Sequence, residues 1–250
     1  MKITRLQKLE DYIKLIGTVS NEELCNEFNI SLQTLRRDLK ILEDNDRIDK
    51  VYGGVVYKDK SLLNSVQAIE NREMLNLKEK KYVAQIAARL VENNSVIFID
   101  SGTTACQIVP YLNHHKNVTV ITHSLLVVNM VAKLQNLKCI CLGGLLKADT
   151  LSFAIDITDN SYHCNIAFIA TVGLSNEGLT NTDIEEGKIK EHMIQCSEKV
   201  YILADHSKLL NKGFYHFADL ENISGVVLDQ KPNDKFINQC NKVGVNLFYE

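Results

Sequence analysis

From about residue 79 onwards, short apolar runs alternate with amphipathic stretches, and this alternation restricts the possible folds more than any other feature. The runs are rich in β-branched residues and nearly continuous, as expected for strands that are covered on both faces of a sheet. They occupy residues 96–99, 118–121, 138–142, 166–171, 200–203, 226–228 and 245–249. Helical patterns separate most of them, at 75–90, 124–134, 183–197 and 234–242. Strands separated by helices predict a doubly wound, mainly parallel α/β domain over residues 79–250.

The first 58 residues predict a separate, smaller domain that begins with two helices. Leu6, Leu9, Ile13 and Ile16 recur at helical spacing and define one apolar face, and Gly17 is expected to end that helix. Ser20 and Glu23 have the spacing of a capping box, so a second, short helix is expected to start after Ser20. Residues 59–78 are polar and mixed in character, which predicts a linker between the two domains.

A third helix and a two-stranded ribbon complete this domain. Ser31 is the expected N-cap of the third helix, whose leucines at 32, 35, 39 and 42 are predicted to face inward. Residues 47–51 and 55–57 flank Gly53-Gly54, a pattern typical of two strands joined by a glycine turn. Three helices followed by a ribbon indicate a winged helix-turn-helix.

The helix capped by Ser31 is the predicted recognition helix, which in such domains lies in the major groove of DNA. Gln33 suits adenine, an arginine suits guanine, and Ser31 and Thr34 suit phosphate or thymine contacts. Asp38 is expected to pair with an arginine and orient it. The predicted DNA-binding residues, including those of the ribbon, are Ser31, Gln33, Thr34, Arg36, Arg37, Lys40, Lys50, Tyr52, Gly53 and Gly54.

Charge alone does not identify a DNA-binding domain here. Residues 1–60 contain eleven Lys and Arg and eleven Asp and Glu, and the whole chain has a formal net charge of −3. A helical interaction module whose charges only face solvent is therefore the alternative. DNA contact has to depend on where the positive side chains are placed.

The run Asp100-Ser-Gly-Thr-Thr104 is the main candidate for a ligand site in the second domain. A buried strand ends in an acidic residue, a glycine turn follows, and two hydroxyl residues open an expected helix, whose amide groups favour an anion such as a phosphoryl group. An ordinary capped helix is the alternative. Other polar residues follow further strands, where open α/β sheets bind ligands. The predicted effector-binding residues are Asp100, Ser101, Gly102, Thr103, Thr104, Gly143, Gly144, Glu185, Lys188, Asp205 and Lys208.

Two groups of residues resemble one known family. Ser31-x-x-Thr34-x-Arg36-Arg37-Asp38-Leu39 followed by Tyr52-Gly53-Gly54 resembles the winged helix-turn-helix of DeoR-type bacterial regulators, over residues 3–58. Asp100–Thr104, Leu142-Gly-Gly144 and Asp205-x-Ser-Lys208 resemble the C-terminal sensor domain of the same family.

The resemblance implies a transcriptional repressor of a sugar or nucleoside catabolic operon, which binds double-stranded operator DNA. A single winged helix of balanced charge has few basic contacts, so we also expect a homo-oligomer, a dimer or tetramer. The resemblance also implies a phosphorylated sugar as effector, with Asp100–Thr104 around the phosphate and Lys188 and Lys208 supplying positive charge. The sensor fold of the family is related to sugar-phosphate isomerases, so an isomerase-like enzyme is the alternative function. Ser175 stands where the family often has an acidic residue, which counts against that enzyme and in favour of a chain with no catalytic residues.

Cysteine usage and hydropathy limit the remaining possibilities. The seven cysteines are scattered and mostly lie in apolar runs, which predicts buried thiols in a reducing compartment. Cys139-x-Cys141 lacks a second Cys or His pair nearby, so no metal site is expected. The run Asp100–Thr104 is neither Gly-x-Gly-x-x-Gly nor a Walker loop, so no cofactor is expected. No run of 18 apolar residues occurs and charges interrupt residues 1–20, so we expect a cytoplasmic protein without membrane contact.

Overall fold

A computed structural model of the chain describes residues 2–45, 47–51, 53–57, 69, 71–155, 162–209 and 211–249. The chain divides into two compact units, Met1–Leu75 and Asn76–Glu250, and each has its own hydrophobic core. No helix within the described ranges is long and apolar enough to cross a membrane.

The N-terminal unit contains three helices and a small antiparallel sheet. Its elements are α1 (Lys2–Ile16), β1 (Thr18–Ser20), α2 (Asn21–Phe28), α3 (Leu32–Asp44), β2 (Ile48–Val51) and β3 (Gly54–Tyr57). The expected capping box is present, since Ser20 Oγ accepts from the amide of Glu23 and Glu23 accepts from the amide of Ser20. Ser31 Oγ likewise accepts from the amide of Thr34 at the start of α3. The winged helix-turn-helix is confirmed.

Two details of this unit differ from the sequence prediction. Leu35, Leu39 and Leu42 are buried, but Leu32 is 43% exposed because α3 begins one turn before the part that packs on the core. The predicted two-stranded ribbon is a three-stranded sheet in the order β1-β3-β2, in which β1 pairs with β3. The sequence did not predict β1 because it has only three residues, which are too few to show a strand pattern. It forms a strand by pairing with β3, some 35 residues further along the chain.

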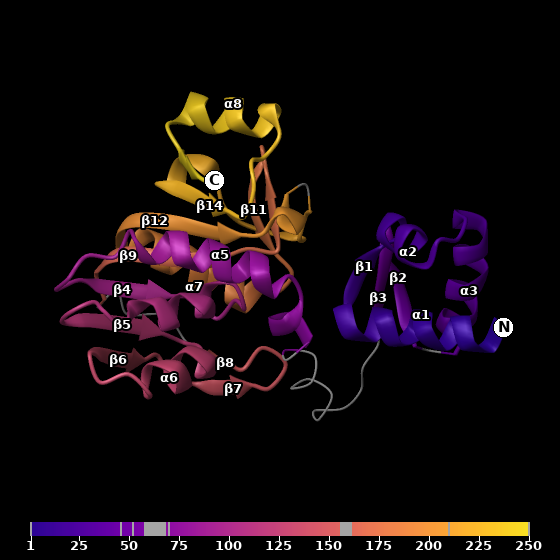
Figure 1. The fold of residues 1–250 in the computed structure, drawn as a ribbon, viewed down its shortest axis with the longest axis horizontal. Helices are drawn as coiled ribbons and strands as arrows, with labels where there is room; N and C mark the ends of the chain where they lie inside the picture. The colour runs from indigo at the N-terminus through magenta and orange to yellow at the C-terminus, as the bar shows by residue number, and fades with distance from the viewer. Residues whose placement is uncertain are drawn as a thin grey trace. The chain divides into compact units, whose positions relative to one another are not determined.

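The C-terminal unit is built on a seven-stranded parallel sheet in the order β15-β14-β12-β9-β4-β5-β6, most of which can be followed in Figure 1. Every pairing in it is parallel. The strands are β4 (Val96–Ile99), β5 (Val118–Thr122), β6 (Leu137–Cys141), β9 (Cys164–Ala170), β12 (Ser197–Ala204), β14 (Gly225–Leu228) and β15 (Asn246–Phe248). All seven predicted strands are thus confirmed, in one parallel sheet.

Helices cover both faces of this sheet, as a doubly wound fold requires. α5 (Leu77–Ala88), the 3₁₀ helix η1 (Ala105–Leu112) and α6 (Leu125–Val131) pack on one face. α7 (Ile184–Gln195) and α8 (Asp234–Val243) pack on the other. Neighbouring strand residues such as Ile97 and Phe98 belong to opposite cores, which explains why the strands have continuous apolar sequences.

The strand order reverses direction between β4 and β9. From β4 the chain proceeds to β5 and β6 on one side, and then returns to place β9 on the other side of β4. In open α/β sheets, ligands bind outside the carboxyl ends of the strands at such a point. Asp100 directly follows β4 and therefore lies at this position.

Additional short strands were not predicted from the sequence. β7 (Leu145–Lys147) and β8 (Ser152–Ala154) form a hairpin after β6. β10 (Gly173–Ser175), β11 (Gly178–Asn181) and β13 (Tyr215–Ala218) form a second, antiparallel sheet. At three or four residues each, these segments are too short for alternation to be recognised in the sequence.

The prediction of buried thiols is wrong for Cys139 and Cys141, which are exposed. Cys106, Cys164, Cys196 and Cys240 are buried, and Cys25 is half-buried. Cys139 and Cys141 both lie on β6, which is an edge strand of the sheet with only its first residue buried. No group of three His, Cys, Asp or Glu side chains in the described part of the chain is arranged to hold a metal ion.

Candidate DNA-binding helix and effector site

The outer face of α3 presents uncompensated positive charge. Arg36, Arg37 and Lys40 are exposed, as is Gln33, and within the described residues no carboxylate forms an ion pair with the three cations. Ser31 and Thr34 are occupied differently, because Ser31 Oγ lies 3.0 Å from Thr34 Oγ1 and 3.2 Å from the Thr34 amide nitrogen. Both hydroxyls therefore take part in the helix cap, and the cations and Gln33 are the groups free to contact DNA.

Asp38 fixes α3 to the rest of its unit. Its carboxylate is 2% exposed, and its Oδ2 accepts from Arg5 Nε at 2.9 Å and lies 2.8 Å from Arg5 Nη2. The arginine expected to pair with Asp38 is therefore on α1, and not a neighbour on α3. Arg36 and Arg37 remain available because Arg5 neutralises the acidic residue beside them.

The wing between β2 and β3 is tightly built around its glycines. Gly53 has a φ of +80°, which favours glycine. A Cβ on Gly54 would lie 2.4 Å from the carbonyl oxygen of Val19 on β1, so Gly54 is required for strand packing. Lys50 forms an ion pair with Glu43 at 2.5 Å, and Tyr52, also predicted to contact DNA, lies outside the described residues.

At the carboxyl end of β4, Asp100 is part of a buried ion pair. It is fully buried, and its Oδ2 accepts from Lys190 Nζ on α7 and from the amide of Ala170 at the end of β9, the latter at 3.0 Å. Burial by itself would raise the pKa of Asp100, but Lys190, His123 and the Ala170 amide hold it below its ordinary value. The carboxylate is therefore ionised and anchored at the point where the strand order reverses.

His123 lies next to this ion pair, directly after β5. Its Nε2 is 4.0 Å from Asp100 Oδ1, and its ring stacks on Phe98 with a centroid distance of 5.8 Å. Burial lowers the pKa of His123 to about 4, and the effect of Asp100 only partly opposes this. The imidazole is therefore neutral at pH 7, with one nitrogen that donates and one that accepts.

The segment between Asp100 and η1 has a different geometry from the one expected. Residues 101–104 form turns, and the helix that follows is 3₁₀, with no side-chain cap from Thr104. Ser101 and Thr104 are buried, whereas Thr103 is half-buried. A Cβ on Gly102 would lie 2.2 Å from Ala170 Cβ, so this glycine is required for packing against β9. A larger residue there would disturb the sheet as well as any bound ligand.

Asp205 and Lys208 follow β12 at the same edge of the sheet. Asp205 is 1% exposed and caps the 3₁₀ turn η2 (His206–Lys208) by accepting from the Ser207 amide at 3.0 Å. It also accepts from Asn76 Nδ2 at 3.2 Å. Burial would raise the pKa of Asp205, but Lys208 and Ser207 lower it overall.

The other predicted effector residues lie around the β7–β8 hairpin or face away from Asp100. A Cβ on Gly144 would lie 2.0 Å from the carbonyl oxygen of Ala154, so Gly144 serves the hairpin, while Gly143 is exposed. Glu185 forms an ion pair with Lys147 of the hairpin at 3.2 Å. Lys188 is exposed, two residues before Lys190 and on a different face of α7.

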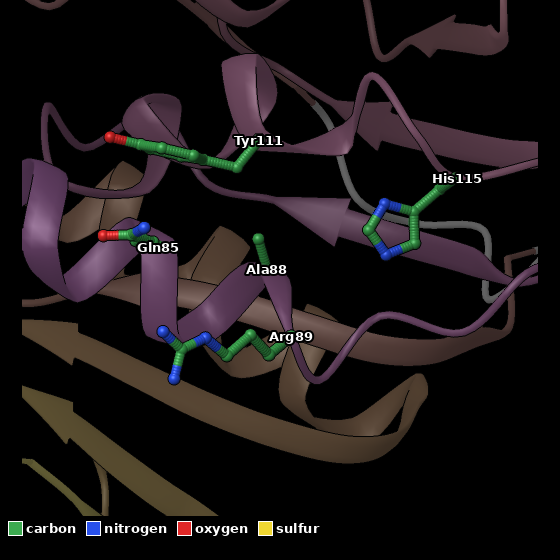
Figure 2. A pocket seen from close by; sticks show the side chains of 5 residues that line it. All are labelled: Gln85, Ala88, Arg89, Tyr111 and His115. Atoms are coloured by element: carbon green, nitrogen blue, oxygen red, sulfur yellow. The ribbon is translucent and has the colours of Figure 1, made fainter.

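A pocket of about 210 Å³ lies elsewhere on the unit, between α5 and the end of η1 (Figure 2). Gln85, Ala88 and Arg89 line it from one side, and Tyr111 and His115 from the other. None of the predicted effector residues is among them. Because α5 ends and β4 begins on this side, the pocket lies toward the amino ends of the strands, away from Asp100.

Sequence reasoning missed Lys190 and His123, two charged or titratable side chains that interact with Asp100. Lys190 has a recognisable signal, because it lies three residues after Gly187 and three before Met193, both buried on α7. A lysine at an inward-facing position of a helix needs a buried partner. His123 follows a predicted strand and precedes the cap residue Ser124, which predicts its position but not its burial.

Comparison with known proteins assigns both units to one family. The DeoR-like helix-turn-helix domain matches residues 5–61, and the DeoR C-terminal sensor domain matches residues 75–230. The HTH-type transcriptional regulator IolR of Bacillus subtilis (strain 168) is 37% identical over 99% of this chain and 100% of its own length.

Two further relatives extend this comparison. The HTH-type transcriptional repressor GlcR of the same organism is 30% identical over 97% of this chain and 94% of its own. The lactose phosphotransferase system repressor of Staphylococcus epidermidis (strain RP62A) is 27% identical over 94% of each chain. Among solved structures, ribose 5-phosphate isomerase A from Methanocaldococcus jannaschii covers 54% of this chain and 55% of its own, at 19% identity and a TM-score of 0.40. The matched family models and relatives establish that this chain belongs to the DeoR family of helix-turn-helix transcriptional regulators.

Proposed function

We propose that this protein is a cytoplasmic repressor of a sugar-related operon that binds operator DNA through α3 and responds to a phosphorylated sugar. The observation that carries the DNA-binding part is the exposed basic face of α3, where Arg36, Arg37 and Lys40 form no ion pair with any described carboxylate. Relatives of this chain include a lactose phosphotransferase system repressor, which supports a sugar-related role.

The effector is proposed to bind at the carboxyl ends of β4, β9 and β12. This edge contains the reversal of strand order, Asp100 at the end of β4 is paired with Lys190, and the charge of Lys208 helps to lower the pKa of Asp205 at the end of β12. The backbone amides of residues 101–104, the half-buried Thr103 and Lys208 are the groups suited to a phosphoryl group. The sugar portion would then extend toward His123 and Asp100.

Calorimetry with matched ligands tests this effector site. Sugar phosphates that shift the melting temperature in a panel are compared with their unphosphorylated parents. We expect the phosphorylated form to bind more tightly by several kcal/mol, because two or three charge-assisted hydrogen bonds are lost without the phosphate. Lys208→Ala should weaken binding, while Lys188→Ala, on the exposed face of α7, should not. Equal affinity for sugar and sugar phosphate would refute the phosphate site.

The effector can control repression only if it binds the DNA-competent and DNA-incompetent states with different affinity. We assign residues 1–58 to DNA binding and 79–250 to sensing, and propose that residues 59–78 couple the two. Operator affinity measured with and without a ligand found in the panel tests this coupling. An effector that binds tightly and leaves operator affinity unchanged would refute it.

A catalytic role as a sugar-phosphate isomerase is the competing function, and the site argues against it. An isomerase needs a carboxylate base that is free to take a proton. The candidates for this base are Glu185, Glu186 and Asp205. Glu185 is paired with Lys147, Glu186 accepts from Asn181 Nδ2 at 3.3 Å, and Asp205 caps η2. Asp100 is likewise paired with Lys190. Ser175 accepts from the Glu177 amide in its own turn. A turnover assay on ribose 5-phosphate and other pentose and hexose phosphates should show no isomerisation.

We further propose that the repressor acts as a dimer or tetramer. One winged helix with balanced charge makes few contacts, whereas two linked half-sites multiply affinity through effective concentration. Light scattering should give an even oligomer at micromolar concentration. A monomer with full operator affinity would contradict this.

A further inference from the structure

His123 and Asp100 contain polar atoms that the fold leaves unsatisfied. Among the described residues, neither ring nitrogen of His123 has a hydrogen-bond partner, and neither has Asp100 Oδ1. The other carboxylate oxygen, Asp100 Oδ2, accepts from Lys190 and from the Ala170 amide. His123 is 1% exposed and Asp100 is 0% exposed. Enclosed polar atoms without partners destabilise a protein, so they are rare unless they serve a purpose.

The sheet places these atoms side by side. Val96, Ile97 and Phe98 of β4 pair with Thr119, Val120 and Ile121 of β5, each 23 residues further along the chain. Asp100 and His123 continue this register just beyond the ends of the two strands, so they share one face with Phe98 and Ile121. The ring of Phe98 stacks on the imidazole of His123, and the two rings are nearly parallel, with an interplanar angle of 4°.

The distance between the unsatisfied atoms suits one bridging oxygen. Asp100 Oδ1 and His123 Nε2 are 4.0 Å apart, too far for a hydrogen bond between them. An oxygen placed about 2.8 Å from each atom fits this separation. A hydroxyl group there would donate its proton to the carboxylate and accept the imidazole N–H, which satisfies both atoms at once. Lys190 donates to Oδ2, so Oδ1 is the carboxylate oxygen that can still accept a hydrogen bond from a bound hydroxyl group.

We propose that Asp100 Oδ1 and His123 Nε2 together bind one hydroxyl group of the effector, which makes His123 a specificity-determining residue of the sensor unit. This inference rests on the proposed function, which locates the effector at this edge of the sheet. The imidazole is neutral at pH 7, so it recognises an uncharged oxygen of the sugar portion, and the phosphate binds elsewhere on the edge. A buried site that binds a hydroxyl discriminates strongly against an analogue that lacks it, because its polar atoms are then left unpaired.

The first test needs no ligand. His123→Met replaces the imidazole by an apolar side chain of similar size that can still pack on Phe98. If the nitrogens await a ligand, the full-length variant should melt about 2–4 °C higher than the wild type, because two unsatisfied buried atoms are removed. If the imidazole has a structural role, through a water or a direct bond to Asp100, the variant should melt lower. A lower melting temperature overturns the proposal.

The second test uses the sugar phosphates that bind the wild-type protein in the thermal panel, with inorganic phosphate as a reference probe. We expect His123→Met to weaken the sugar phosphates about 10- to 100-fold, the loss of one hydrogen bond in a dry site, and to leave inorganic phosphate unchanged. Replacement of His115, whose imidazole lies toward the other end of the strands, by Met should leave ligand affinity unchanged. Unchanged affinity in His123→Met would refute the assignment.

The two parts of the hypothesis fail in different ways. If no sugar phosphate binds the wild-type protein, the proposed phosphorylated effector is wrong, and the melting temperature of His123→Met alone then decides whether the imidazole is structural. If sugar phosphates bind but do not require His123, the effector site stands and the hydroxyl-binding role is wrong.

Discussion

The outer face of α3 and the carboxyl edge of the sensor sheet both collect charged residues, but they treat charge in opposite ways. On α3, Arg36, Arg37 and Lys40 are exposed and make no ion pairs among the described residues. At the sensor edge, Asp100 and Lys190 are almost completely buried and paired with each other. The first arrangement suits a large polyanion that brings its own charge, and the second suits a small ligand that must leave water to bind.

The largest expected effect is a loss of stability when the buried ion pair of the sensor unit is broken at Lys190. Lys190→Met keeps the length of the side chain but leaves Asp100 buried without its cation, which should cost about 3–5 kcal/mol of unfolding free energy in the sensor unit. Lys188→Met is the matched control on the exposed face of the same helix and should change stability by less than about 0.5 kcal/mol.

Hydrogen–deuterium exchange in increasing urea would measure this effect for peptides of β4 and β9, separately from the N-terminal unit. Asp100→Asn combined with Lys190→Met should recover part of the loss, because the uncompensated charge is gone. Equal stability of the Lys190 and Lys188 variants would show that the ion pair does not hold the sensor edge together.

The second effect concerns pH and His123. The folded protein keeps this imidazole neutral down to about pH 4, whereas the unfolded chain protonates it below about pH 6.5. Unfolding therefore takes up a proton between these values, and stability falls as the pH falls through that window. His123 should account for a loss of about 3 kcal/mol between pH 7 and pH 4.

The difference between wild type and His123→Met isolates this residue from the other histidines. Urea titrations of both proteins between pH 7 and pH 4 should show a shallower fall for the variant. Parallel pH profiles would mean that His123 is already protonated or accessible in the folded state. The pKa of Asp100 is lowered in the folded protein, so protonation of Asp100 reduces stability only below about pH 4.

The same contrast explains which features could be predicted from the sequence. The caps at Ser20 and Ser31, the seven parallel strands and the basic face of α3 depend on local spacing, and each could be predicted from the sequence. The pairing of Asp100 with Lys190, 90 residues away, depends on α7 packing across the sheet. The helical spacing around Lys190 indicates that this lysine needs a buried partner, but it does not indicate which residue that partner is. Gly102 shows the same limit of local patterns. Its position in a motif typical of phosphate binding suggests contact with a ligand, but the sequence does not reveal that Gly102 also packs closely against Ala170.

The third effect concerns DNA affinity at α3. Arg36→Ala and Arg37→Ala should each weaken operator binding by about 1–3 kcal/mol. The residue that reads a base should also relax specificity at one base pair, and the one that contacts phosphate should lower the salt dependence by about one counterion. Both variants should keep wild-type stability because the two side chains are exposed and form no ion pair with another described residue. Footprinting and affinity measurements at several salt concentrations would test this, and two variants that bind like the wild type would refute the role of α3.

The smallest effect on operator affinity is expected at Lys50. This residue tests whether a lysine on the DNA-binding unit can contact DNA when it already forms an ion pair. Lys50 lies on the wing and was predicted to contact DNA, but Glu43 forms an ion pair with it at 2.5 Å. An exposed pair of this kind contributes about 0–1 kcal/mol, and DNA phosphate would have to replace a carboxylate of the same sign. Lys50→Ala should therefore weaken operator binding by less than about 1 kcal/mol, and Glu43→Gln should strengthen it slightly by releasing the lysine. Operator affinity should be measured for both variants and for Arg36→Ala under the same conditions. If Lys50→Ala loses as much affinity as Arg36→Ala, an existing ion pair does not prevent a lysine from contacting DNA.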